Sequence, residues 1–130
     1  MRNRIIIVDD DPINNHMSSY FISQTLTETD IISFELPIEA LEFLNDASIM
    51  KDESYMNVIL LDINMPAISG WDVLDEFEKM TPHIHEHFKI FLVSSSIDPK
   101  DRERSDANIF VKELLSKPLT DSVIRKLFTA

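Results

Sequence analysis

The sequence predicts an α/β fold: a five-stranded parallel sheet, doubly wound in the order 2-1-3-4-5, in a three-layer sandwich. Short apolar runs alternate along the chain with segments of helical period, which is the pattern of strand–helix units in a parallel sheet. The clearest apolar runs are continuous, as expected of strands that helices cover on both faces. The length of 130 residues suits one domain with this strand order.

Five apolar runs mark the expected strands. The third run is the most apolar, so we place it at the centre of the sheet. Crossovers between parallel strands are right-handed, which leaves few topologies to consider. The expected strands are Ile5–Val8, Asp30–Glu35, Asn57–Asp62, Phe88–Ser94 and a stretch within Ile109–Leu115.

The first helix follows the first strand directly. Asp11 is suited to cap it and Pro12 to begin it, because Asp is favoured at the N-cap and proline at the first helical position. His16 is placed on the exposed polar face of this helix. Apolar side chains recur at helical spacing, and we interpret them as core: Ile13, Met17, Tyr20 and Phe21.

Four further helices alternate with the remaining strands. They are expected from Pro37, after Gly70, from Asp98-Pro99 to about Ala107, and at the end of the chain. The second helix carries Ile38, Leu41, Leu44 and Ala47 on one face. The third turns Trp71, Leu74 and Phe77 inward. The last is amphipathic through Leu119, Val123, Ile124, Leu127 and Phe128.

Two local features invite their own interpretation. Gly70 is the only glycine in the chain, so we predict that its position needs a backbone conformation that other residues resist. The stretch "HIHEH", His83–His87, joins a helix to the fourth strand. Alternating histidines on an extended segment would share one face and could bind a metal, but we interpret this stretch as a solvated loop.

Composition excludes several classes of function. The net charge of −11 disfavours general attraction to nucleic acid or an anionic membrane. The absence of cysteine excludes disulfides and thiolate zinc sites. The start of the chain does not resemble a signal peptide, and no apolar stretch approaches the ~20 residues that span a membrane. We therefore expect a cytoplasmic protein.

Polar side chains follow four of the five expected strands. Asp9 and Asp10 follow the first strand, Asp62 ends the third, Ser94 ends the fourth and Lys117 follows the fifth. Ligand sites in doubly wound sheets lie beyond the carboxyl ends of the strands, near the switch between strands 1 and 3. Converging carboxylates suit magnesium, and a lysine and a hydroxyl beside them suit phosphoryl transfer to a carboxylate.

Four motifs extend this argument to a family. "VDDDP", "LLDINMPAISG", "FLVSSS" and "SKPL" resemble, in order and spacing, the signatures of response-regulator receiver domains. The resemblance covers essentially the whole chain and implies a flavodoxin-like fold. It also implies a phosphoacceptor of a two-component or phosphorelay system, with a histidine kinase or phosphotransfer protein as donor and a downstream protein as target. The implied cofactor is magnesium, for which manganese can substitute.

The resemblance also implies roles for individual residues. Asp62 resembles the phosphoacceptor. Asp9 and Asp10 resemble the metal-binding acids, and Asn64 would offer its backbone carbonyl to the metal. Ser94 and Lys117 resemble the hydroxyl and the amine that contact the phosphoryl group. The bond from this lysine to the next residue, Pro118, is cis in many relatives.

The switch and the domain boundaries complete these expectations. The family often has Tyr or Phe three residues before the lysine, where this chain has Leu114, so we expect the polar helix around 100–107 to carry more of the conformational change. The first helix would dock the kinase through Ile13, Asn14 and Met17, and the helix around 100–107 would signal together with the last strand and helix. We expect residues 1–130 to form a single receiver domain without an output domain.

Two alternative functions stay open at the level of sequence. One is a haloacid-dehalogenase-type phosphatase, with Asp9 as nucleophile and Asp11 as acid. The sequence lacks the further acidic pair that such an enzyme needs after the lysine. A phosphatase of this type would also leave "LLDINMP" unexplained. The other is a degenerate receiver that acts only as an interaction module, although such modules usually lack the acceptor, an acid or the lysine.

Overall fold

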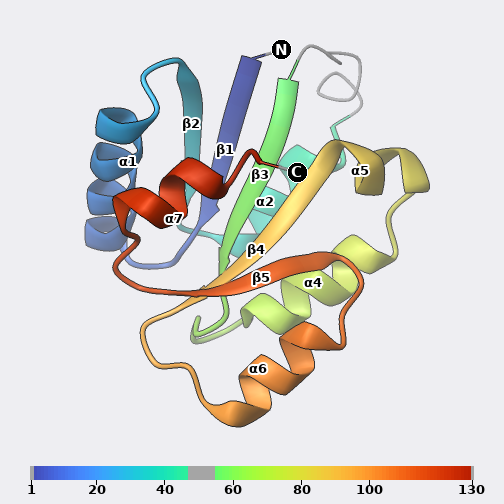
Figure 1. Ribbon diagram of the computed structural model, residues 1–130. Helices are drawn as coiled ribbons and strands as arrows, with labels where there is room; N and C mark the ends of the chain where they lie inside the picture. The colour runs from blue at the N-terminus through green and yellow to red at the C-terminus, as the bar shows by residue number, and fades with distance from the viewer. Residues whose placement is uncertain (1, 47–54, 130) are drawn as a thin grey trace.

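The computed structural model describes residues 2–46 and 55–129. Its centre is a parallel sheet of five strands in the order β2-β1-β3-β4-β5, which confirms the predicted fold class and topology (Figure 1). The most apolar strand, β3, lies in the middle, as predicted. The strands are β1 (Arg2–Val8), β2 (Thr29–Phe34), β3 (Tyr55–Asp62), β4 (Phe88–Ser94) and β5 (Val111–Ser116).

Helices cover both faces of the sheet and give two separate cores. One core lies under α1 and α7 and the other under α2, α4 and α5. Neighbouring residues of one strand serve opposite cores: Ile5 and Ile7 face the first, and Ile6 and Val8 face the second. The helices are α1 (Pro12–Thr25), α2 (Pro37–Leu44), α4 (Gly70–Glu78), α5 (Pro82–His87), α6 (Pro99–Asp106) and α7 (Asp121–Lys126).

The inward face of α1 differs from the prediction. Asn15 and Ile22 are its buried residues. The side chains that were interpreted as core lie outside instead: Ile13, Met17, Tyr20 and Phe21 are 68%, 45%, 56% and 39% exposed. Helical spacing shows that such residues share a face but does not show which face meets the sheet. His16 is exposed, as predicted.

The apolar faces of the other helices follow the prediction in part. In α2, Leu44 is buried, but Ile38 is 56% exposed and Ala40 takes the inward position; Ala47 lies outside the described residues. In α4, Leu74 and Phe77 are buried, and Trp71 is half-buried. In the closing segment, Ile124 and Leu127 are buried, with Leu119, Val123 and Phe128 packed against that core.

The histidine-rich segment forms a short helix, α5, and the predicted loop is therefore wrong. Pro82 occupies the first helical turn and Ile84 is buried in the core. The ring of His85 packs against Phe77 and Phe110, with centroid distances of 4.9 and 4.4 Å. Its Nε2 atom also lies 2.7 Å from the Phe77 carbonyl oxygen. This histidine therefore has a structural place in the fold.

Gly70 is required for a different reason from the predicted one. No described glycine has a positive φ, so backbone strain does not explain it. A Cβ atom at Gly70 would lie 2.4 Å from the carbonyl oxygen of Asp62 and 2.7 Å from the Cα of Ile63. The Gly70 N–H donates to the Ile63 carbonyl at 3.2 Å. The first turn of α4 thus rests directly on the main chain that follows β3.

The polar helix α6 buries no large apolar side chain of its own. Its buried residue is Ser105. The Arg104 guanidinium lies 4.3 Å from the centroid of the Trp71 ring on α4. Just beyond the helix, Asn108 Nδ2 donates to Glu78 at 2.7 Å. The helix is therefore held by a small buried residue and by polar and cation–aromatic contacts.

The amino edge of the sheet buries a cation. Arg4 is 9% exposed, and its Nε donates to Asn57 Oδ1 at 2.7 Å. Its guanidinium lies 4.3 Å from the Tyr55 ring centroid and 5.7 Å from that of Phe43. Aromatic faces attract a cation, so these rings partly replace the water that it gives up.

Candidate functional site

The carboxyl edge of the sheet brings three aspartates together. Oxygen atoms of Asp9, Asp10 and Asp62 all lie within 4.8 Å of one another. Asp9 and Asp62 are buried, with 4% and 6% of their surface exposed, whereas Asp10 is exposed. The cluster lies where β1 and β3 end, which is the switch point of the doubly wound sheet.

Lys117 joins this cluster from the loop after β5. Its Nζ lies 2.7 Å from Asp9 Oδ2 and 3.1 Å from Asp62 Oδ2. The Lys117–Pro118 bond is cis, and the Lys117 N–H donates to the Ser94 carbonyl at 2.9 Å. The lysine thus bridges the two buried carboxylates, with the shorter contact to Asp9.

Burial and charge pairing shift the pKa values of Asp62 and Lys117 in this site. Burial raises the pKa of the Asp62 carboxyl, and it outweighs the Asn64 N–H and the Lys117 charge, which lower that pKa. Burial lowers the pKa of the Lys117 amine, but the hydrogen bond to Asp9 and the charges of both aspartates outweigh it and leave a raised pKa. The amine therefore stays protonated, while the site has an excess of negative charge.

Main-chain and amide donors fix the aspartates. The Asp11 N–H donates to Asp9 Oδ1 at 2.9 Å, and the Asn64 N–H donates to Asp62 Oδ1 at 3.0 Å. Asn15 Nδ2 donates to the Asp9 carbonyl at 2.8 Å from within α1. Asp11 itself accepts from the Ile13 N–H and caps α1, as predicted.

Sequence reasoning missed Asn15. A polar residue in a helix reads as exposed, but this one is only 5% exposed because it reaches back to the main chain of the β1–α1 turn. One signal in the sequence was its spacing: Asn15 follows the capping Asp11 by four residues, and residues four apart on a helix lie on the same side. Its side chain therefore lies close to the start of the helix.

The hydroxyl of Ser94 is fully buried at the end of β4 and bonds to its neighbours. It donates to the Ser96 carbonyl at 2.9 Å and accepts from the Ser96 N–H at 3.1 Å. The Asn64 carboxamide donates to it at 2.9 Å. Asn64 therefore contacts the Asp62 carboxylate through its main chain and Ser94 through its side chain.

The donor set fits a hard divalent cation. Three carboxylates converge here with one lysine, so the described groups leave net negative charge around two buried acids. Mg²⁺ prefers oxygen ligands and keeps several waters, which suits an edge where Asp10 stays open to solvent. Asp9, Asp10 and Asp62 could hold such an ion; the structure does not specify which ion.

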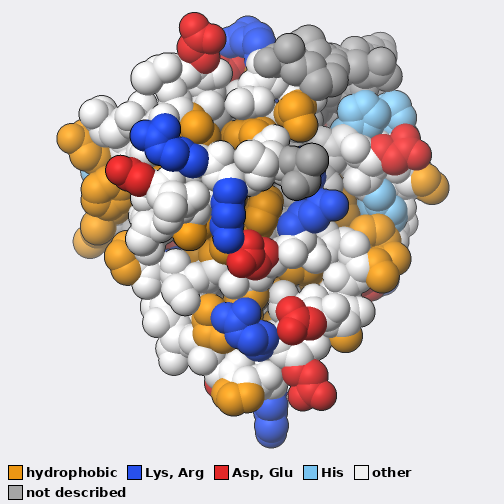
Figure 2. Space-filling model, in the orientation of Figure 1, with side chains coloured by type: hydrophobic (Ala, Val, Ile, Leu, Met, Phe, Trp, Pro, Cys, Tyr) orange, Lys and Arg blue, Asp and Glu red, His pale blue; other side chains and the backbone are white. Residues whose placement is uncertain are grey.

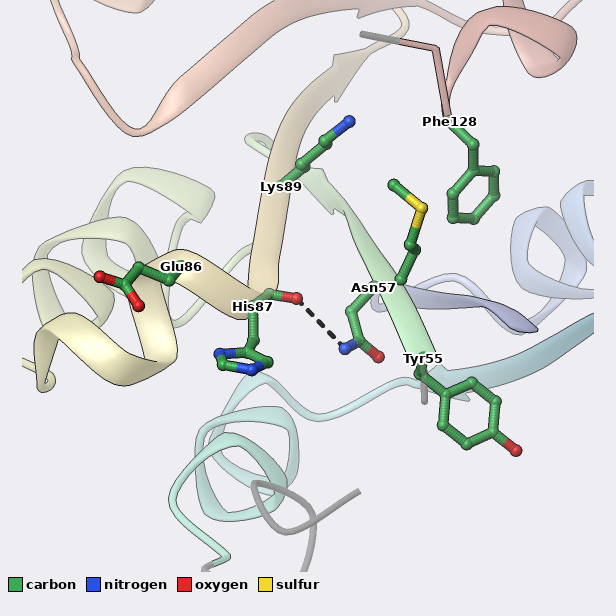
Figure 3. A pocket seen from close by; sticks show the side chains of 7 residues that line it. Tyr55, Asn57, Glu86, His87, Lys89 and Phe128 are labelled. Atoms are coloured by element: carbon green, nitrogen blue, oxygen red, sulfur yellow. Dashed lines mark hydrogen bonds between the residues drawn. The ribbon is translucent and has the colours of Figure 1, made fainter. Parts of the chain in front are cut away.

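Hollows lie at both edges of the sheet. Beside Lys117, a groove of about 320 Å³ runs between α1 and the segment after β5, lined by Asn14, Met17, Ser18, Phe21, Ser95, Lys117, Pro118 and Leu119. At the other end of the sheet lies a hollow of about 350 Å³ bordered by Asn57, Lys89 and Phe128 (Figure 3). The groove beside Lys117 lies next to the acidic cluster, and the hollow at Lys89 does not.

These observations define a doubly wound α/β domain with an acidic pocket and a bridging lysine at its switch point. A family model described as the response regulator receiver domain matches residues 5–129, and the chain belongs to this family. It is therefore a receiver domain of the two-component response regulator class, for which magnesium and phosphorylation are typical.

Solved structures agree with this assignment. A two component response regulator from Cytophaga hutchinsonii is 29% identical, with a TM-score of 0.85, and the match covers 98% of this chain and 94% of that one. A response regulator receiver protein from Dyadobacter fermentans is 25% identical, also with a TM-score of 0.85, over 96% and 94% of the two chains.

A curated relative is much longer than this chain. The 3′,5′-cyclic-nucleotide phosphodiesterase regA of Dictyostelium discoideum is 24% identical over 129 residues. The match covers 95% of this chain but only 14% of the relative. Within the described residues, none of the helices has the length and apolar character needed to cross a membrane.

Proposed function

We propose that this receiver accepts a phosphoryl group on Asp62 from a phosphohistidine of a sensor kinase or phosphotransfer protein. The contact of the Asp62 carboxylate with Lys117, beside Asp9 and Asp10, carries the proposal. This arrangement supplies a nucleophile, a fixed cation and an acidic metal-binding set within one pocket.

The transfer follows from the chemistry of these groups. An Asp62 carboxylate oxygen forms a bond to phosphorus while the P–N bond of the phosphohistidine breaks. The leaving imidazole keeps the electron pair of that bond and takes up a proton. A bound divalent cation supplies charge neutralisation for the phosphoryl oxygens. Lys117 Nζ, which lies 3.1 Å from Asp62 Oδ2, contributes a second positive charge to the product.

Ser94 and Asn64 have supporting roles in this proposal. Ser94 has one hydroxyl hydrogen, and it is donated to the Ser96 carbonyl. To donate to a phosphoryl oxygen, Ser94 must release that carbonyl. The Asn64 main-chain carbonyl is proposed as a metal ligand, following the family.

The exposed apolar face of α1 supports a docking surface for the donor. Ile13, Met17 and Phe21 are exposed on the helix that follows the acidic turn. The groove beside Lys117 is lined in part by Asn14, Met17 and Phe21. A donor seated there would bring its phosphohistidine close to Asp62, and burial of the apolar face would contribute to its affinity.

Incubation with acetyl phosphate and magnesium tests the proposal. Intact mass should show one phosphoryl adduct, and peptide mapping should place it on Asp62. Asp62→Ala should abolish the adduct, while Asp75→Ala, at an exposed position on α4, should leave it unchanged. An unmodified wild-type protein would instead favour a degenerate receiver, and an adduct on Asp9 would favour a phosphatase of the haloacid-dehalogenase type.

A further inference from the structure

Positive charge is concentrated near the end of this acidic chain. Residues 109–130 contain four Lys or Arg against two Asp or Glu, whereas the preceding 108 residues contain eight against 21. One of the four cations, Lys117, belongs to the acidic pocket. The other three, Lys112, Arg125 and Lys126, lie on β5 and α7.

Lys89 extends this group to the start of β4. Its Nζ donates to the Thr129 carbonyl at 3.4 Å, and the Thr129 hydroxyl donates to the Lys126 carbonyl at 2.7 Å. Figure 2 shows Lys and Arg side chains across the face formed by α7, β5 and β4. We call Lys89, Lys112, Arg125 and Lys126 the cationic patch.

Part of the positive charge of the patch is not neutralised by ion pairs among the described residues. Lys126 pairs with Glu113 at 3.0 Å, and the two side chains are 46% and 45% exposed. Lys112 and Arg125 form no hydrogen bond or ion pair with another residue in the parts of the chain that the structure describes. Exposed, unpaired cations keep their full capacity to bind an anionic group.

An apolar hollow adjoins the patch at Lys89. The hollow of about 350 Å³ at the amino edge is lined by Lys89, Met56 and Phe128, and also by Tyr55, Asn57, Glu86 and His87. Figure 3 shows the Lys89 and Phe128 side chains projecting toward the same space. A ligand that spans patch and hollow would therefore meet positive charge first and apolar surface next.

We propose that the cationic patch docks an acidic segment of a protein partner. Asp or Glu side chains of the segment pair with Lys112, Arg125 and Lys126, and one apolar side chain enters the hollow beside Lys89. The inference rests on the proposed function because it specifies the chemistry of the downstream target.

Charge distribution favours a short protein segment over a nucleic acid or a membrane. Charges act across about 8–10 Å at physiological ionic strength. A long polyanion that covered the patch would extend over the rest of the molecule, where the side chains outside the patch include 23 acidic and eight basic ones. A short acidic segment meets only the patch and avoids this repulsion.

A titration with a synthetic peptide of glutamates flanking one leucine tests the proposal. Amide NMR shifts should concentrate in residues 109–129 and at the start of β4, and added salt should weaken binding. Reversal of three charges, Lys112→Glu, Arg125→Glu and Lys126→Glu, should weaken binding at least about tenfold, because three exposed ion pairs are lost.

A matched control separates the patch from overall charge. Lys79→Glu, Lys100→Glu and Arg102→Glu change the net charge equally at exposed sites, one at the C-cap of α4 and two on α6, and should leave binding within about twofold. An equal loss in this control, no peptide binding to the wild type, or tighter binding of a DNA duplex or an anionic vesicle at the same amides would overturn the proposal.

The same proteins distinguish this proposal from the function at Asp62. Both triple variants leave the acidic pocket intact, so acetyl phosphate should label them as it labels the wild type. Loss of labelling in every protein, with peptide binding retained, would count against the phosphoacceptor and not against the patch. Labelling without peptide binding would count only against the patch.

Discussion

The two edges of the sheet bury charge in different ways. At the carboxyl edge, Asp9 and Asp62 are buried beside a single lysine, Lys117. At the amino edge, Arg4 is buried between aromatic rings and donates to Asn57. The buried cation of each edge lacks a balanced partner: Lys117 faces two buried carboxylates, and Arg4 pairs with no carboxylate among the described residues, although the more exposed Arg2 pairs with Asp30 at 3.2 Å.

The difference lies in what can complete each edge. At the amino edge, neutral groups of the protein surround the buried Arg4, although its Nη2 has no hydrogen-bond partner among the described residues. The carboxyl edge keeps an excess of carboxylates, with Asp10 open to solvent. We therefore expect a divalent cation to stabilise the carboxyl edge and to leave the amino edge unchanged.

The largest expected effect is at Lys117. Lys117→Met leaves Asp9 and Asp62 without their shared cation, so the free energy of unfolding should fall by about 3 kcal/mol without divalent ions. Urea unfolding should show that millimolar Mg²⁺ restores part of the loss. The exposed pair Lys79–Glu76 offers a control, since Lys79→Met should cost less than about 1 kcal/mol.

The pH dependence of this variant follows from the raised pKa of Lys117. In the wild type, the charged amine contributes its full stabilisation at pH values below the ordinary lysine pKa of 10.5. This stabilisation is lost as the pH rises through the pKa of the folded state. The difference between wild type and Lys117→Met should therefore be constant at neutral pH and shrink at strongly alkaline pH. A constant difference at all pH values would contradict the proposed ion pairing.

The next largest effect is expected at Gly70, which supports the carboxyl edge through its main chain. Gly70→Ala places a Cβ 2.4 Å from the Asp62 carbonyl oxygen, so α4 or the loop must move, at a cost of about 2 kcal/mol. Mg²⁺ should not restore this loss, because the clash is steric. Asp75→Ala on the exposed face of α4 should leave urea unfolding nearly unchanged.

The corresponding change at the amino edge should be smaller. Arg4→Met removes a buried cation but leaves Asn57 Oδ1 without the donor that lies 2.7 Å away, for a net loss of about 1 kcal/mol. The loss should be the same with and without Mg²⁺ in urea unfolding. A loss that Mg²⁺ reversed would show that the two edges are not independent.

The smallest effect concerns the charge of Asp62 itself. Because burial raises the pKa of Asp62, its ionised form is less favourable in the folded than in the unfolded protein. Asp62→Asn should therefore slightly increase stability at neutral pH without Mg²⁺. The gain in stability should vanish as the pH falls below the ordinary aspartate pKa of 3.8, because Asp62 is then neutral in both the folded and the unfolded state. Thermal unfolding across this pH range measures it, and a gain that persists in acid would contradict the assignment.

The sequence was sufficient for the sheet and for the acidic cluster. Continuous apolar runs identified strands such as Asn57–Asp62, and the rule for strand ends then placed Asp9, Asp10, Asp62 and Lys117 at one edge. These features depend on chain order and sheet geometry alone. No contact between side chains had to be known in advance.

The predictions that were wrong concern residues whose environment is set by a tertiary contact. The apolar residues of α1, such as Met17 and Tyr20, share a surface, but the contact of Asn15 with the Asp9 main chain turns the opposite face inward. Gly70 is required by the approach of two main chains, which leaves no signal in its neighbours. The proposed larger movement of α6, prompted by Leu114, stays a prediction; Leu114 itself is buried in the core.

The contact between α4 and α6 gives the molecule an internal optical reporter. Trp71 is the only tryptophan in the chain, and its ring lies 4.3 Å from the Arg104 guanidinium. Tryptophan emission therefore comes from one side chain, and we expect it to change when the cation leaves the ring. Fluorescence of the unlabelled protein can therefore follow the separation of α6 from α4 in real time.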